Sequence, residues 1–240
     1  MEKEYTLSLR ERKHAQTKIA LAEAVMERLK AKRLEDISVK EVCETIPVSE
    51  VTFYNYFPQK TDVLVYILQL WRLEMEWHLL EWEEEKSNLE MIEAYFDLAA
   101  QSFEEYPGVL SETIAYFTQK RGCIHFDDLS IAEKILAFPK LPGIEEIQLP
   151  SNPKDKKFFE KYARRAVAAE ELPSNTDVEL VTHSVEALFI GSIMAFHLEQ
   201  PTFIRPLCQN TLKIFWKGLW QNAKDEAAAS MSGNLQLAFN

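Results

Sequence analysis

The side chains with the clearest recognition chemistry lie together in one stretch, between residues 40 and 60. A glutamate accepts a hydrogen bond from the amino group of cytosine, and an asparagine pairs with adenine or with a phosphate. Lysine ammonium groups bind phosphate oxygens. Glu50 and Asn55 therefore have the chemistry of base reading, and Lys40 has that of a phosphate contact.

Patterns typical of enzymes are missing from the sequence. It has no glycine-rich phosphate loop, no Gly-x-Ser-x-Gly and no His-Glu-x-x-His. Glutamates crowd residues 81–85, but consecutive positions point around a helix and do not converge on a metal. We therefore expect a binding protein that is not an enzyme, with no cofactor and no metal.

Charge and cysteine usage narrow the class of protein. Residues 1–60 carry 11 Lys/Arg and 10 Asp/Glu, whereas the remaining 180 residues carry 16 Lys/Arg and 28 Asp/Glu. The acidic part of the chain after residue 60 would therefore repel DNA, and the N-terminal 60 residues would not. Cys43, Cys123 and Cys208 have neither zinc-site nor disulfide-framework spacing, which favours reduced thiols. We expect a cytoplasmic protein without a membrane partner, because we find no secretory signal and no apolar run near the roughly 20 residues that span a bilayer.

Three helices are predicted at the N-terminal end. Apolar residues at steps of three and four predict one helix over residues 9–34. Ser38 is a typical N-cap for a second helix, and Glu41 would complete a capping box. Pro47 breaks that helix, and a third short helix starts at a serine cap and ends before Pro58. Two short helices joined by a tight turn behind a longer helix form a helix-turn-helix.

The amino-acid sequence of this segment makes the prediction of a helix-turn-helix more specific. A Val-Ser pair is followed by an aromatic-rich run and a lysine, in the order Val48-Ser49-Glu50-Val51-Thr52-Phe53-Tyr54-Asn55-Tyr56-Phe57-Pro58-Gln59-Lys60. Over about residues 10–65 the chain resembles the TetR family of transcriptional regulators, in which this pair opens the recognition helix. The resemblance implies a repressor that binds palindromic operator DNA as a homodimer. It also implies release from DNA by a small-molecule effector.

Two positions depart from the family pattern, since Pro47 and Val51 stand where glycine is common. Proline forbids the positive φ that glycine permits, so we expect the turn to take another form. The inward face of the recognition helix is assigned to Val48, Phe53 and Phe57. The predicted DNA-contacting residues are Lys40, Ser49, Glu50, Thr52, Tyr54, Asn55, Tyr56 and Lys60. The resemblance adds that Thr52, Tyr54, Tyr56 and Lys60 match positions that commonly touch phosphates or bases; packing between the short helices is the alternative role for the two tyrosines.

The rest of the chain is predicted to be helical. A long fourth helix starts near Lys60, a proline-rich loop covers 139–153, and two apolar helices cover about 176–198 and 203–222. The fold class is all-α: an N-terminal three-helix helix-turn-helix domain followed by a helical ligand-binding and dimerisation domain. The predicted boundaries are 1–60, 61–224 and a flexible tail at 225–240. We expect the two apolar helices to form a two-fold dimer interface.

The resemblance also implies an effector site in the helical body. The candidate lining consists of Trp71, Met75, His78, Phe96, Phe103, Tyr116, Phe117, His125, Phe189 and Met194. An ordinary hydrophobic core is the alternative for such a stripe, and the two histidines would be polar anchors in a pocket. The competing function is a helical interaction protein in which the N-terminal helices cap the bundle without binding DNA.

Overall fold

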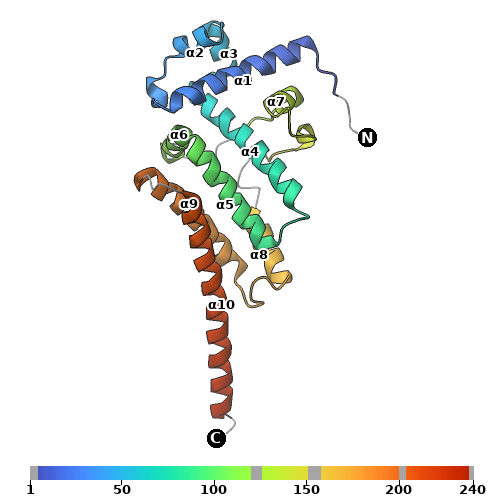
Figure 1. Ribbon diagram of the computed structural model, residues 1–240, viewed down its shortest axis with the longest axis vertical. Coiled ribbons are helices and arrows are strands. Elements are labelled where there is room, and N and C mark those ends of the chain that lie inside the picture. Colours follow the sequence, from blue (N-terminus) through green and yellow to red (C-terminus); the bar gives the residue numbers. More distant parts are fainter. Residues whose placement is uncertain (1–4, 120–125, 151–157, 200–203, 238–240) are drawn as a thin grey trace. The chain divides into compact units, whose positions relative to one another are not determined.

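A computed structural model describes residues 5–119, 126–150, 158–199 and 204–237, with side chains described as far as residue 225 (Figure 1). The elements in chain order are α1 (Leu9–Leu29), η1 (Leu34–Asp36), α2 (Val39–Thr45), α3 (Glu50–Tyr56), α4 (Asp62–Trp82), α5 (Asn88–Glu105), α6 (Pro107–Gln119), α7 (Ile131–Ala137), η2 (Ile144–Glu146), α8 (Phe158–Ala168), α9 (Val178–Glu199) and α10 (Ile204–Leu237). Within the described residues there is no strand, and the predicted all-α fold with its N-terminal helix-turn-helix is confirmed.

The chain divides into two compact units. The first comprises Met1–Glu81 with Ser102–Lys156, and the second comprises Trp82–Gln101 with Lys157–Asn240. The helix-turn-helix therefore lies wholly in the first unit, together with most of α4 and all of α6 and α7. The functional boundary at residue 60 stays a prediction.

The core of the first unit explains why its short helices form. Phe53 and Phe57 of the α3 segment are 0% and 1% exposed, and Val42 of α2 is fully buried. Burying a side chain of this size contributes about 1.5–3 kcal/mol. α1 begins with a complete capping box, in which the Ser8 hydroxyl accepts from the Glu11 amide and the Glu11 carboxylate accepts from the Ser8 amide. This acidic side chain in the first turn offsets the basic residues near the same helix end.

Several helix ends differ from the predicted ones. α1 ends at Leu29, five residues before the predicted end, because the chain turns so that Leu34 and Ile37 enter the core at 4% and 2% exposure. α4 starts at Asp62, whose carboxylate accepts a hydrogen bond from the Gln59 amide at 2.7 Å. This bond reaches back from the first turn of α4 to the preceding chain and fixes that turn, close to the start predicted near Lys60.

The second unit is held by charged contacts as well as by aromatic packing. The Glu171 carboxylate accepts from the backbone amides of Asn88 and Leu89 at 3.0 and 2.9 Å and so caps the start of α5. Arg205 of α10 donates from Nε to the Asp97 carboxylate of α5 at 2.9 Å. An aromatic cluster joins α5, α8 and α9 through Tyr95, Phe96, Phe158, Phe159 and Phe189.

α9 is long and apolar enough to cross a membrane. Residues Val178–Leu198 have a mean hydropathy of 1.4, and only 17% of this stretch is buried within the chain. The expectation that no apolar run approaches about 20 residues is therefore wrong. An interface helix of a soluble protein meets the same criteria, and this stretch carries two glutamates and two histidines.

α10 continues further than its apolar pattern indicated. The sequence predicts a frayed tail from Ala227, but the helix extends to Leu237. The alanines at 227–229 explain the extension, because alanine has the highest helix propensity.

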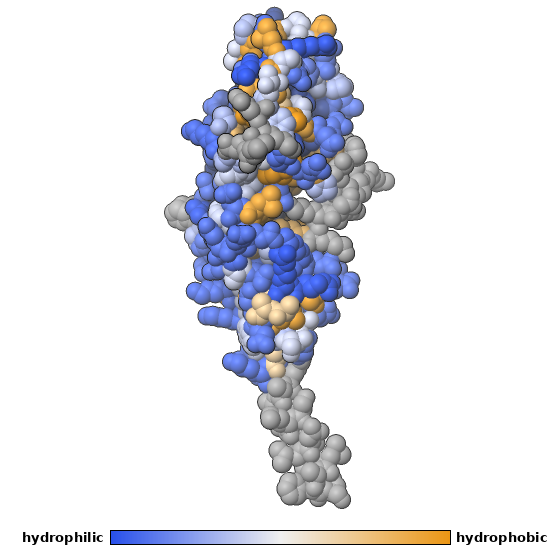
Figure 2. Space-filling model, turned by 90° about the vertical axis from the view of Figure 1, so that its right-hand side faces the viewer, coloured by the Kyte–Doolittle hydropathy of each residue, from blue (hydrophilic) through white to orange (hydrophobic). Residues whose placement is uncertain are grey.

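Hydrophilic residues predominate on the face of the molecule shown in Figure 2, with small separate hydrophobic patches between them.

Candidate nucleic-acid interface

α3 presents two chemically different faces. Phe53 packs inward, whereas Glu50, Val51, Tyr54 and Asn55 are exposed, with Tyr54 at 45%. A helix-turn-helix reads DNA through side chains of its second helix that project away from the domain. The structure thus places three of the predicted base-reading or phosphate-binding residues on one solvent-facing side of α3.

Two predicted contact residues also have an internal structural role. The Ser49 hydroxyl accepts from the Thr52 amide at 3.1 Å, and the Ser49 and Thr52 hydroxyls lie 2.8 Å apart. These bonds satisfy one of the free amides at the start of α3. Ser49 therefore caps α3, and Thr52 is half-buried beside it.

The start of α1 flanks α3. The ring of His14 lies 4.7 Å from the ring of Tyr56, centroid to centroid. Tyr56 is half-buried, so packing between helices, the alternative stated from the sequence, accounts for part of its surface. Arg10, Arg12 and Lys13 are exposed one turn from this contact, and their positive charge lies on the same domain as α3. His14 is a neighbour of α3 that the sequence did not indicate, because a lone histidine carries no motif.

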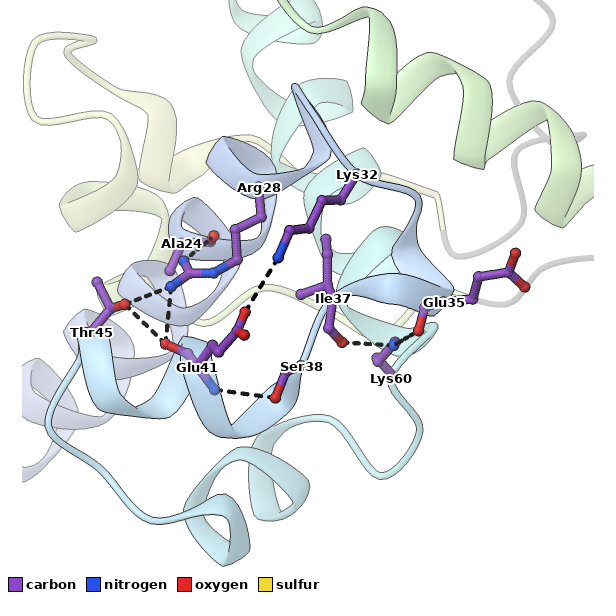
Figure 3. A network of polar contacts seen from close by, with 9 residues as sticks. All are labelled: Ala24, Arg28, Lys32, Glu35, Ile37, Ser38, Glu41, Thr45 and Lys60. Carbon is purple, nitrogen blue, oxygen red and sulfur yellow. Dashed lines mark hydrogen bonds and ion pairs between the residues drawn. The ribbon is translucent and has the colours of Figure 1, made fainter.

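Lys60 is held by the backbone between η1 and α2. Its Nζ donates to the carbonyl oxygens of Glu35 at 2.9 Å and Ile37 at 2.8 Å (Figure 3). An ammonium group has three donors, so one remains for a phosphate. The predicted phosphate contact stays a prediction, and removing Lys60 would also release two carbonyls of the scaffold.

Arg28 ties α1 to α2 at the other side of the same network. Its guanidinium donates to the Ala24 carbonyl at 2.8 Å, the Glu41 carbonyl at 2.9 Å and the Thr45 hydroxyl at 2.6 Å (Figure 3). The predicted capping box at Ser38 is half formed. The Ser38 hydroxyl accepts from the Glu41 amide at 3.4 Å, but the Glu41 carboxylate turns to Lys32 at 3.5 Å.

Replacing Arg28 by alanine should destabilise the helix-turn-helix. Hydrogen bonds to a charged donor are worth about 1.5–3 kcal/mol each, and partial exposure reduces the sum, so we expect a loss of about 2 kcal/mol. Arg28→Lys keeps the charge but not the forked donor geometry, and should recover only part of the loss. Urea unfolding followed by circular dichroism measures both variants, and an unchanged midpoint in Arg28→Ala would contradict the assigned role.

The two departures from the family pattern have different outcomes. Pro47 has a φ of +23°, far from the value near −65° of an ordinary proline, and the predicted change in the form of the turn stays a prediction. Val51 lies in regular helix and is 70% exposed, so it does not alter the path of α3.

Comparisons with known proteins bear on the fold. No family model matches the chain, and no curated protein matches it. Solved structures do match it. One of them is the TetR family transcriptional regulator PfmR of Thermus thermophilus, which is 16% identical with a TM-score of 0.52 over 83% of this chain and 98% of that chain. Two others are the transcriptional regulator FadR of Bacillus subtilis with stearoyl-CoA (16% identity, TM-score 0.53, 83% of this chain and 98% of that chain) and the TetR family repressor FadR of Thermus thermophilus with lauroyl-CoA (17% identity, TM-score 0.51, 82% of this chain and 92% of that chain). The chain has the TetR-family fold.

The effector-site candidates of this TetR-fold chain fall into both compact units. In the first unit Trp71 stacks on Phe103 at 6.2 Å, and the Trp71 indole donates to the Ser102 hydroxyl at 2.9 Å. In the second unit Phe96 and Phe189 are in edge contact at 5.0 Å. The remaining candidates are placed individually: Met75 is buried, His78, Tyr116 and Met194 are half-buried, Phe117 is 49% exposed, and His125 lies outside the described residues.

Burial shifts the pKa values of two titratable groups in the middle of α4 toward their neutral forms. It raises the pKa of Glu74, with Glu105 adding to the effect, and it lowers the pKa of His78 against the opposing influence of Glu81. Glu74 and His78 are four residues apart and so lie on the same face of the helix. Both pKa shifts favour the uncharged form of the side chain, which is suited to contact with an apolar ligand or with the hydrophobic core of the protein.

Proposed function

We propose that the protein is a TetR-type transcriptional regulator, a cytoplasmic repressor that binds palindromic operator DNA as a homodimer and is released by a small-molecule effector. The exposed polar side of α3, with Glu50, Tyr54 and Asn55, carries this proposal. If the N-terminal helices merely capped the bundle, α3 would have no need of an outward row of hydrogen-bonding side chains. The fold and the Val48-to-Lys60 signature support the same function.

The outward sides of α9 and α10 support the homodimer. Ile190 and Leu198 on α9 and Ile214 on α10 are 60%, 73% and 72% exposed. We call the exposed apolar residues Ile190 and Leu198 on α9 and Ile214 on α10 the apolar stripes of these two helices. Gly191 lies on the stripe of α9 and Gly218 on that of α10, and a Cβ built at either glycine meets no atom within 4 Å. A glycine inside a helix costs about 1 kcal/mol relative to alanine. Close approach of a second copy explains both glycines, and two-fold symmetry is the commonest solution for such a pair.

An effector of apolar character fits the helical body best. The Trp71–Phe103 stack and the buried Met75 lie on α4 and α5, and the neighbouring titratable groups favour neutral forms. The two FadR structures hold acyl-CoA molecules, which makes acyl chains a reasonable first set of compounds to test. Release from DNA requires that the effector bind the two states of the repressor with different affinity, typically by 1–3 kcal/mol.

DNA binding is tested by selecting tight binders from a random duplex library with the full chain. Tyr54→Ala should then weaken binding to the selected DNA about 5- to 100-fold, the effect of losing one contact worth 1–3 kcal/mol. Tyr54→Phe isolates the hydroxyl. Lys40 has an exposed side chain 4.0 Å from Glu44, so Lys40→Ala should weaken binding to all sequences alike and lower the salt slope by about one.

The contrast between the two variants separates base reading from phosphate contact. Tyr54 is uncharged, so its loss should leave the salt slope unchanged. Failure of the chain to enrich any sequence from the library would overturn the proposed function. Enrichment with no response to either substitution would remove these two residues from the interface and leave the function standing.

A further inference from the structure

One residue on the outward side of α3 has no hydrogen-bonding group. Val51 is 70% exposed, and its neighbours on this side are Glu50, Tyr54 and Asn55. Val51, Tyr54 and Asn55 are spaced by three and four residues and therefore share a face of the helix. Val51 thus places a branched apolar side chain in the middle of a polar recognition surface.

Internal packing does not account for this valine. At 70% exposure Val51 contributes little to the core, and the inward side of α3 is already filled by Phe53, with Phe57 directly after the helix. A β-branched residue also lowers helix propensity slightly. The same branching restricts the side chain to one main rotamer in a helix, so its methyl groups are presented in a fixed position.

We propose that Val51 reads thymine, by placing its side chain against the C5-methyl group of one thymine in each operator half-site. This inference rests on the proposed function. In the major groove thymine alone among the four bases carries a methyl group, and apolar side chains recognise it. Cytosine carries only a hydrogen at C5, and adenine and guanine present the polar N7 on the same edge, so none of the three offers a valine an equivalent apolar contact.

The neighbouring residues are chemically consistent with this assignment. The Glu50 carboxylate accepts hydrogen bonds only, so it disfavours the acceptor atoms of guanine and favours amino groups. The first turn of α3 is fixed by the Ser49–Thr52 bonds at 2.8 and 3.1 Å, which hold Val51 in register with Glu50. Val51 therefore supplies an apolar contact beside the polar contact of Glu50, and the two residues together specify more of the operator sequence than either residue alone.

The test is a uracil scan of the DNA selected by the full-length protein. Each thymine of the selected duplex is replaced in turn by deoxyuridine, which removes only the methyl group. In each half-site we expect one thymine whose replacement lowers the affinity of the wild-type protein about fourfold, because one buried methyl group is lost. Replacing this thymine in both half-sites at once should lower the affinity about fifteenfold. Val51→Ala should lose most of this sensitivity to uracil, because its one remaining methyl group is Cβ, which lies further from the base than the valine γ-methyl groups.

Two controls keep the test decisive. Val51→Thr retains a methyl group and should retain most of the sensitivity to uracil, while thermal unfolding of both variants should match the wild type because the side chain is exposed. A selected site in which no uracil weakens the wild type more than Val51→Ala overturns the inference but not the proposed function. Failure to select any specific DNA overturns both.

Discussion

A leucine in place of Gly191 is expected to convert the proposed dimer into a monomer and to abolish tight operator binding. A Cβ at Gly191 meets no atom within 4 Å in its own chain, so the substitution should not disturb the fold, and it removes a glycine from a helix. In the proposed dimer the same side chain would push the partner helix away. Loss of the second recognition helix removes the bivalent gain, which is about 10²- to 10⁴-fold.

Sedimentation at micromolar concentration and gel shifts on the selected DNA measure the two effects. Gly191→Ala is the graded comparison: it raises helix propensity by about 1 kcal/mol, and because it adds only one methyl group at the close approach it should weaken the dimer less than leucine does. Gly218→Leu repeats the test on α10, where the added Cβ is also unobstructed. If Gly191→Leu and Gly218→Leu both stay dimeric with full operator affinity, these stripes are not the interface. Recovery of the chain in the membrane fraction would assign the apolar side of α9 to lipid instead.

Local signals in the sequence were sufficient to predict the recognition helix. Ser49 caps α3 as expected, Phe53 is buried, and Pro58 follows the end of the helix. These features depend on residues within one or two turns of each other, so their spacing along the chain is also their spacing in space. Ser38 likewise caps α2, although its Glu41 partner is drawn to Lys32 by charge.

Contacts between distant residues could not be predicted in the same way. The sequence makes Lys60 a phosphate candidate, but it does not indicate that Lys60 bonds to carbonyls 23 and 25 residues away. Nor does it indicate that Lys18 pairs with Glu133. Such partners depend on how the helices pack, which periodicity does not specify.

The candidate effector lining shows a further limit of sequence patterns. Apolar residues at steps of three and four mark the buried side of a helix, whether it faces a core or a ligand. Trp71 and Phe103 do come together, whereas Phe117 is half-exposed on α6. Pairing of side chains from different helices is therefore known only once the helices are placed.

Replacing Lys18 by methionine is expected to be among the most destabilising changes in the first unit. Glu133 of α7 is 4% exposed, and its carboxylate lies 2.7 Å from the Lys18 ammonium group of α1. Lys18 also lies 4.2 Å from the centre of the Tyr66 ring of α4, so one cation joins three helices. Removing one partner of a buried ion pair costs about 3–5 kcal/mol, because the other charge is left without compensation.

The double variant Lys18→Met with Glu133→Gln separates loss of packing from the stranded charge. It should recover much of the stability, since replacing both partners of a buried pair by neutral side chains is often close to neutral. The measurement is chemical unfolding at pH 7 of the wild type, both single variants and the double variant. Equal losses in Lys18→Met and in the double variant would show that the charge of Glu133 is not the cause.

The pH dependence of the same variants gives an independent check. Burial alone would raise the pKa of Glu133, but hydrogen bonds and charge from Lys18, with the Ser130 cap, outweigh burial and hold it below its ordinary value. A lowered pKa in the folded state means that the stabilisation is present above the unfolded-state value of about 4.3 and is lost as pH falls through the folded-state value. In Lys18→Met burial should dominate and raise the pKa, so the deficit seen at pH 7 should shrink as the carboxyl takes up a proton near pH 5. A deficit that stays constant from pH 7 to pH 5 would mean that Glu133 is not ionised and stranded in the variant, and that Lys18 acts through its packing on Tyr66.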